Sequence, residues 1–155
     1  MFSLIVSIIS IALVAVLAAA SIYYGGDAFT KGSAKALAST VVTQAQQISS
    51  ANTLFKNDNG GVSAASVDAL VTGEYLASVP AMPSKVGAVN LAIAADIDTV
   101  TAGDQGGVSA VITNAEVCKL INEQANGTET FSANAQYGCE SDGGDPAVMT
   151  FKYKG

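Results

Sequence analysis

The first 26 residues form an almost unbroken apolar run, and no side chain between Met1 and Gly26 is charged. About 20 apolar helical residues span the hydrocarbon core of a bilayer, so the run predicts a helix of membrane-spanning length over residues 1–26. Tyr23 and Tyr24 lie where the run ends, a position typical of aromatic residues at a membrane surface. A cleaved signal peptide fits less well, because no Lys or Arg precedes the run. A plain membrane anchor and a helix that also packs against other protein chains both stay open.

Residues 27–56 change the pattern from uniformly apolar to amphipathic. Lys35, Gln44, Gln46, Gln47 and Asn52 are expected on the sides of this helix that do not pack. We expect the apolar face, with Leu37, Val41, Ile48 and Phe55 as its main contacts, to pack against a globular head. Apolar residues recur at helical spacings of three, four or seven and so share that face: Ala34, Leu37, Val41, Ala45, Ile48 and Phe55.

Gly25 and Gly26 lie between these two segments. Each glycine costs a helix about 1 kcal/mol relative to Ala, so we predict that the helix bends here. A loop that joins two separate helices is the alternative. If the helix is continuous, about 54 residues extend roughly 80 Å at 1.5 Å per residue.

Residues 57–155 are predicted to form one globular head of the α+β class, with an antiparallel sheet packed on the long helix. Asn57–Gly61 is a helix breaker. The alternation of apolar and polar residues over 147–154 predicts the clearest strand. The other predicted elements are a helix over 63–76, strands over 88–95, 96–101 and 108–113, a helix from its cap at Asn114 to Asn126–Gly127, and strand segments at 130–131 and 135–137.

Charge and cysteine content limit the possible functions. The formal net charge is −6, and the chain contains no His. Direct nucleic-acid binding is not expected, because it needs a basic surface that neutralises phosphates. Cys118 and Cys139 favour one disulfide in an exported domain, with two free thiols as the alternative. Two cysteines without His cannot complete a zinc site.

No residue pattern indicates an enzyme, a cofactor site or a metal site. The lack of His excludes Ser–His and Cys–His catalysis. Asp96 with Asp98, and Asp142 with Asp145, carry the oxygen ligands that Ca²⁺ prefers, but a solvated acidic loop is the favoured interpretation. The sequence from Asn126 to Thr128 matches a glycosylation sequon, which is a weak signal.

Four blocks of the sequence, taken in order, resemble type IV pilins, most closely the type IVb group. The first block is FSLIVSIISIALVAVLAAASIYY, which runs into the amphipathic helix and is the only specific motif. The others are DALVTGEYLASVP, TNAEVCKLI, and YGC followed by AVMTFKYK. The resemblance implies a ladle-shaped subunit with the α+β pilin fold, N-terminal helices bundled in a filament core, and a disulfide-closed C-terminal region on the filament surface.

The resemblance also implies the partners of the chain and its place in the cell. Such a subunit is held in the inner membrane and depends on a prepilin peptidase and on pilus assembly machinery. It then forms a homopolymer, which is a filament on the surface of the bacterial cell. The residues expected to pack in the filament core are Phe2, Leu4, Ile5, Ile8, Ile9, Ile11, Ala12, Ala15, Val16 and Ala19.

One position departs from the family pattern. Pilins commonly carry Glu as the fifth mature residue, whereas this chain has Ile5 counted from Met1, or Val6 counted from Phe2. Neither residue can form the ion pair that such a Glu makes with a neighbouring subunit. An atypical major pilin, a minor pilin, a secretion-system pseudopilin and a conjugation-type subunit therefore stay open. A different class also stays open: a single-pass, membrane-anchored exported domain that binds a ligand.

Overall fold

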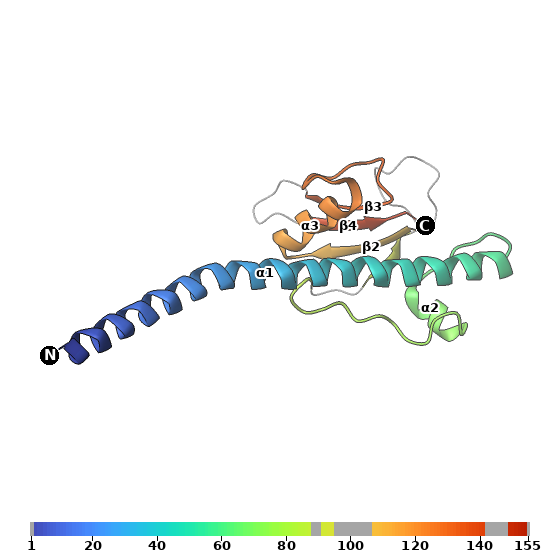
Figure 1. Cartoon of the computed structure of the whole chain (residues 1–155). Coiled ribbons are helices and arrows are strands. Elements are labelled where there is room, and N and C mark those ends of the chain that lie inside the picture. Colours follow the sequence, from blue (N-terminus) through green and yellow to red (C-terminus); the bar gives the residue numbers. More distant parts are fainter. Residues whose placement is uncertain (1, 88–90, 95–106, 142–148, 155) are drawn as a thin grey trace. The chain divides into compact units, whose positions relative to one another are not determined.

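The computed structural model describes residues 2–87, 91–94, 107–141 and 149–154. It has the predicted α+β class: a long N-terminal helix, short helices and an antiparallel sheet, as in a pilin-like fold (Figure 1). In chain order, the elements are α1 (Phe2–Asp58), α2 (Val67–Thr72), β1 (Ala92–Ala94), β2 (Gly107–Ile112), α3 (Ala115–Asn126), β3 (Tyr137–Ser141) and β4 (Met149–Tyr153).

Helix α1 is continuous across Gly25 and Gly26, so the alternative of a loop between two helices is wrong. Helical hydrogen bonds on both sides of the glycines outweigh their cost of about 1 kcal/mol each. A bend at this point stays a prediction. The chain divides into two compact units, Met1–Ser33 and Ala34–Gly155, so that α1 contributes to both.

In the second unit, the apolar face of α1 forms one side of the hydrophobic core. Val41, Ala45 and Ile48 are fully buried, and Leu37 and Phe55 pack at the edge of the same cluster. The predicted face is therefore confirmed, because the helical period had already placed these residues together. The breaker that follows is also confirmed, since α1 ends at Asp58.

Asn52 is the exception on this helix. It was assigned to a side of the helix that does not pack, but only 1% of its surface is exposed. Its Oδ1 accepts a hydrogen bond of 2.9 Å from the backbone N–H of Ala64, which ties the loop after α1 back onto the helix. A buried amide is tolerated where it is hydrogen-bonded, and this bond forms only once the loop folds back.

The four strands form one antiparallel sheet in the order β1-β2-β4-β3. β2 and β4 lie at its centre, and Ala110 stands opposite Phe151 in their register. Val108, Ala110, Ile112, Met149 and Phe151 are buried on the face that belongs to the core, so the predicted alternation of the last strand is confirmed. At the end of β4, the rings of Tyr137 and Tyr153 stack with 6.1 Å between centroids.

Helix α3 matches its predicted bounds. Asn114 caps its start, where its side-chain oxygen accepts hydrogen bonds from the N–H groups of Glu116 and Val117 at 3.1 and 3.3 Å. Gly127 ends the helix with a φ of 77°, a left-handed conformation that glycine adopts without strain. Both signals are local, which is why the sequence located this helix correctly.

The helix predicted over 63–76 is shorter than expected, because α2 covers only Val67–Thr72. Ser66 caps its start, where its side chain accepts a hydrogen bond of 3.2 Å from the N–H of Ala69. Glu74 has a φ of 63°, and a residue in this left-handed region cannot continue an α-helix. The helix therefore ends before Tyr75 and Leu76, the apolar residues whose helical spacing had placed its predicted end at residue 76.

The remaining strand predictions had mixed outcomes. β1 lies within the predicted range 88–95, whereas the range 96–101 lies outside the described residues. Residues 130–131 and 135–136 are not in strands, and β3 instead begins at Tyr137. Two consecutive residues of β3 are both buried, so the strand lacks the alternation from which a strand is predicted.

The Cys118–Cys139 disulfide is present and joins α3 to β3 with 5.3 Å between the Cα atoms. Both cysteines are buried. Beside the disulfide, the side chain of Asn122 bonds both backbone groups of Cys139: its Oδ1 accepts from the N–H at 2.7 Å, and its Nδ2 donates to the C=O at 2.9 Å. Asn122 thus takes the place of a neighbouring strand at the outer edge of β3.

Candidate assembly surface

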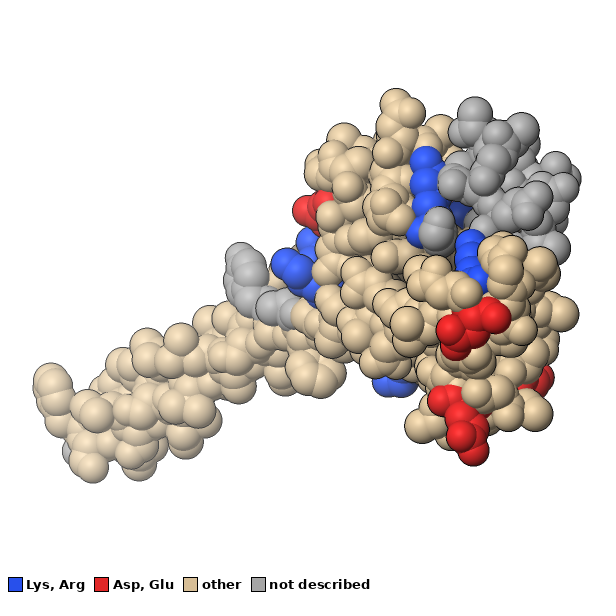
Figure 2. Space-filling view, turned by 90° about the vertical axis from the view of Figure 1, so that its right-hand side faces the viewer, with Lys and Arg blue, Asp and Glu red and all other residues tan. Residues whose placement is uncertain are grey.

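The segment Phe2–Tyr23 of α1 is long and apolar enough, by length and composition, to cross a membrane. Its large side chains are all solvent-exposed within the chain, and Phe2 and Ile11 are 86% and 71% exposed. Figure 2 shows this rod without any acidic or basic side chain. All ten residues predicted to pack in a filament core lie on this exposed surface. An apolar surface of this size marks a contact with lipid or protein.

Two serine hydroxyls of this segment are satisfied within the helix. The hydroxyl of Ser7 donates to the C=O of Ser3 at 3.1 Å, and that of Ser10 donates to the C=O of Val6 at 2.9 Å. A polar group without a partner is costly in an apolar environment, and these bonds remove that cost. The serines are therefore compatible with a segment that is buried in lipid or among other helices.

The segment has two chemically different sides. At about 100° per residue, the predicted filament-core residues cover one half of the helix. The opposite side contains a stripe of small residues within an arc of about 80°. These residues recur every three or four positions in the sequence, a helical spacing that the sequence-based predictions did not include. Small side chains let two helices approach closely. The stripe consists of Ser3, Ser7, Ser10, Ala18 and Ser21, and the larger Val14 interrupts it.

A second uncharged surface lies on the part of α1 that belongs to the head. From Ala36 to Phe55 no residue is charged, although the face that points away from the core is exposed. Exposed helix faces in water are normally rich in charged side chains. Here the hydroxyls of Thr40, Thr43, Ser50 and Thr53 each donate to the carbonyl four positions earlier. Such a face is polar but costs little to remove from water.

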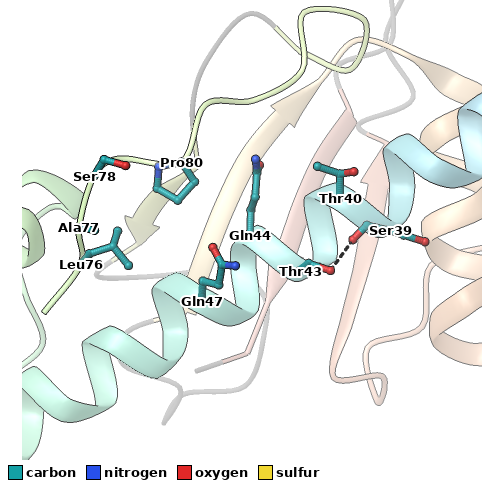
Figure 3. A pocket seen from close by; sticks show the side chains of 9 residues that line it. All are labelled: Ser39, Thr40, Thr43, Gln44, Gln47, Leu76, Ala77, Ser78 and Pro80. Atoms are coloured by element: carbon teal, nitrogen blue, oxygen red, sulfur yellow. Dashed lines mark hydrogen bonds between the residues drawn. The ribbon is translucent and has the colours of Figure 1, made fainter.

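A shallow groove of about 600 Å³ runs between this face and the segment Leu76–Pro80. Figure 3 shows Gln44 and Gln47 extending from α1 toward that segment. The Nε2 of Gln44 donates to the C=O of Ala81 at 2.9 Å, whereas its Oε1 is buried and has no hydrogen-bond partner. No charged or aromatic side chain is among the described residues that line the groove.

One side chain near the end of α1 has a shifted pKa. The hydroxyl of Tyr75 donates to the Oδ2 of Asp58 at 2.8 Å. This hydrogen bond favours the neutral phenol and raises the pKa of Tyr75 above its ordinary value. The bond ties the segment after α2 to the last turn of α1.

Among the described residues, no three His, Cys, Asp or Glu side chains lie close enough together to hold a metal ion. The acidic pairs Asp96–Asp98 and Asp142–Asp145 lie outside the described residues, so a solvated acidic loop stays a prediction there. In the sequon, the Asn126 side chain is engaged: its Nδ2 donates to the C=O of Thr130 at 2.9 Å.

The comparisons with known proteins gave no match: no protein-family model, no curated protein and no solved structure is significantly similar to this chain. The function of this chain is therefore inferred from the two surfaces of α1 and from the fold that carries them.

Proposed function

We propose that this protein is a structural subunit of a type IV pilus, most like the type IVb group. It is stored in the inner membrane through Phe2–Tyr23 and polymerises into an extracellular filament by packing this helix against copies of itself. The observation that carries the proposal is the absence of charge on two exposed surfaces of the same helix, one apolar and one polar.

The apolar surface supports storage in a membrane and burial in a filament equally well. Burying it removes on the order of 1,000 Å² of apolar surface, which corresponds to about 25 kcal/mol at about 25 cal/mol per Å² before ordering costs are subtracted. A helix with this surface is not tolerated in water, so it needs lipid before assembly and other helices afterwards.

The polar surface favours a filament over a plain anchor. About 20 residues already fill a bilayer, so lipid does not explain why residues 36–55 also lack charge. An anchored domain that stays monomeric would gain solubility from charges on that face, whereas packing between copies would exclude them. The small stripe on the apolar segment supports the same conclusion, because it suits close helix contacts.

The fifth position suggests how the subunits find their register. Ile5 or Val6 cannot form an ion pair with a neighbour, so register would come from the fit of large against small side chains. The lack of Glu at the fifth position also keeps two variants of the proposal open, a minor pilin and a secretion-system pseudopilin. All three share the membrane-stored helix and differ in the number of copies per filament.

The test is a charge placed in the apolar segment of the intact chain. Ala15→Asp leaves an unpaired buried charge in the assembled state, at a cost of about 3 kcal/mol, or about a 100-fold loss of assembly affinity. Filaments sheared from cells and imaged by electron microscopy should disappear. Ala133→Asp, the same change at an exposed position of the head, should leave them intact.

Two results would overturn the proposal. One is normal filaments from Ala15→Asp cells when the variant is present in the membrane fraction. The other is the absence of filaments from wild-type cells that also supply an assembly machinery. The second result would favour the monomeric, membrane-anchored domain instead.

A further inference from the structure

We propose that the pair Asn59–Gly60 at the end of α1 is a site of spontaneous deamidation, and that the fold protects the same pair, Asn126–Gly127, at the end of α3. These are the two Asn–Gly pairs in the sequence. The inference concerns a covalent modification of the head and does not depend on the proposed function.

Deamidation of an Asn–Gly pair is an intramolecular acyl transfer in which water is the other reactant. The backbone nitrogen of the glycine gives up its proton to solvent and forms a bond to Cγ of the asparagine. The bond between Cγ and Nδ2 then breaks, the leaving nitrogen takes up a proton, and ammonia departs from a five-membered succinimide ring. Water opens this ring at either carbonyl and yields an aspartyl or an isoaspartyl residue. Glycine permits the attack because it has no side chain to hinder a close approach.

The two pairs share the same local backbone. Each glycine follows the last turn of its helix in a left-handed conformation, with φ values of 68° at Gly60 and 77° at Gly127. Neither the residue types nor the conformation of the glycine therefore separates the two pairs. They differ in the hydrogen bonds that must break before the glycine nitrogen can reach Cγ.

The attacking nitrogen is the first difference between the pairs. The N–H of Gly127 donates to the C=O of Glu123 at 2.9 Å and so continues the hydrogen bonding of α3. At the end of α1 the chain skips this bond, because the N–H of Gly61 donates to the C=O of Lys56 at 2.7 Å. Within the described part of the chain, no group accepts a hydrogen bond from the N–H of Gly60. This nitrogen can attack without first leaving an acceptor.

The side chain of Asn126 is held by the loop that follows it. Its Nδ2 donates to the C=O of Thr130 at 2.9 Å. Its Oδ1 accepts from the N–H and from the hydroxyl of Thr128, at 2.9 and 2.8 Å. The side chain must rotate to bring Cγ to the glycine nitrogen, and this rotation breaks all three bonds.

The side chain of Asn59 has fewer bonds to lose. Its Nδ2 donates to the C=O of Phe55 at 2.9 Å, and the side chain also forms a hydrogen bond with Tyr75. Asn59 and Gly60 are both exposed, so water and hydroxide reach the pair directly.

The count of these bonds sets the expected difference in rate. Ring closure at Asn126 breaks four hydrogen bonds, including that of the glycine N–H. Ring closure at Asn59 breaks two. One net hydrogen bond changes a rate about fivefold, so two additional bonds slow the reaction at Asn126 about 25-fold.

Conversion at Asn59 also changes the surroundings of Tyr75. It places a new carboxylate next to Asp58, which already accepts the hydrogen bond of the Tyr75 hydroxyl. The hydrogen bond from Asn59 lowers the pKa of Tyr75 in the unmodified chain. Loss of this bond and the added negative charge should raise the pKa of Tyr75 further.

Peptide mapping of the intact chain, aged in detergent micelles at mildly alkaline pH, tests the proposal. Cleavage after lysine places the two asparagines in separate peptides, and mass spectrometry follows the replacement of NH₂ by OH at each. Conversion at Asn59 should be at least about tenfold faster than conversion at Asn126. In urea, which unfolds the head, the two pairs should convert at similar rates because neither keeps its hydrogen bonds.

Thr128→Val provides a second test within the same molecule. It removes the hydroxyl that donates to Oδ1 of Asn126, so conversion at Asn126 should become about fivefold faster while the rate at Asn59 stays the same. Near-ultraviolet circular dichroism before ageing establishes that the head of this variant is folded.

Two results would overturn the inference. One is conversion at Asn126 in the folded wild-type chain that is as fast as conversion at Asn59, or faster. The other is a folded Thr128→Val variant in which Asn126 converts no faster than in wild type. Neither result bears on filament formation, so the proposed function stands or falls separately.

Discussion

Asn122 should be among the most important polar residues of the head for stability, and Asn122→Leu tests this directly. The side chain is 4% exposed and lies at the outer edge of β3, the last strand of the sheet. It satisfies the N–H and the C=O of Cys139 and also donates to the C=O of Glu129 at 3.2 Å. Leu has a similar volume and no hydrogen-bonding group, so the change removes these bonds without opening a large cavity.

The expected cost follows from the groups left behind. Each buried backbone group that loses its partner costs about 1–3 kcal/mol, and Cys139 has two such groups. Improved burial of Leu returns about 1 kcal/mol of this loss. We expect the free energy of unfolding to fall by about 3 kcal/mol, a large fraction of the stability of a typical domain.

Denaturant unfolding of the intact chain in detergent micelles measures this change. The chain contains five Tyr and no Trp, so tyrosine fluorescence or near-ultraviolet circular dichroism reports on the fold. Asn134→Leu, the same substitution at an exposed position, serves as the control and should change stability by less than about 0.5 kcal/mol. Equal effects of the two substitutions would refute the view that Asn122 replaces a neighbouring strand.

Two further predictions concern covalent and ionisable groups. Reducing the disulfide, which closes a loop of 21 residues, should lower the free energy of unfolding by about 3 kcal/mol, as denaturation with and without reductant will measure. Asp58→Asn should lower the pKa of Tyr75 toward its ordinary value, because the carboxylate that favours the neutral phenol is gone. The raised pKa means that this contact stabilises the fold below pH ~10 and that the stabilisation is lost as the pH rises through the pKa of the folded state. An ultraviolet titration of tyrosinate absorbance, together with stability at alkaline pH, checks both points, and an unchanged titration would contradict the assignment.

The elements that the sequence located correctly are those whose signals are local. Helix α3 has a cap at Asn114 and a left-handed glycine at Gly127, and β4 alternates strictly. The face of α1 that contains Val41 and Ile48 follows from helical periodicity alone. Neighbouring residues encode such features, so no knowledge of the rest of the chain is needed.

Most of the inaccurate predictions are those in which distant residues decide. The exception is α2, which ends early at its C-cap Gly73, a local signal, before Glu74 takes a left-handed conformation. β3 has no clear alternation and is held as an edge strand by Asn122 and by the disulfide. Asn52 looks like a surface residue in the sequence and is buried only because the loop after α1 folds back onto it.

The same division applies to the candidate surfaces. The sequence by itself determined the uncharged apolar segment, its helical form and its length, because hydrophobicity and helical period act over adjacent residues. Only the tertiary structure decided that the uncharged face of residues 36–55 lies exposed beside a groove and that Oε1 of Gln44 is buried there without a partner. Those facts arise when Leu76–Pro80 packs beside α1, and a contact between segments more than 25 positions apart has no local signature in the sequence.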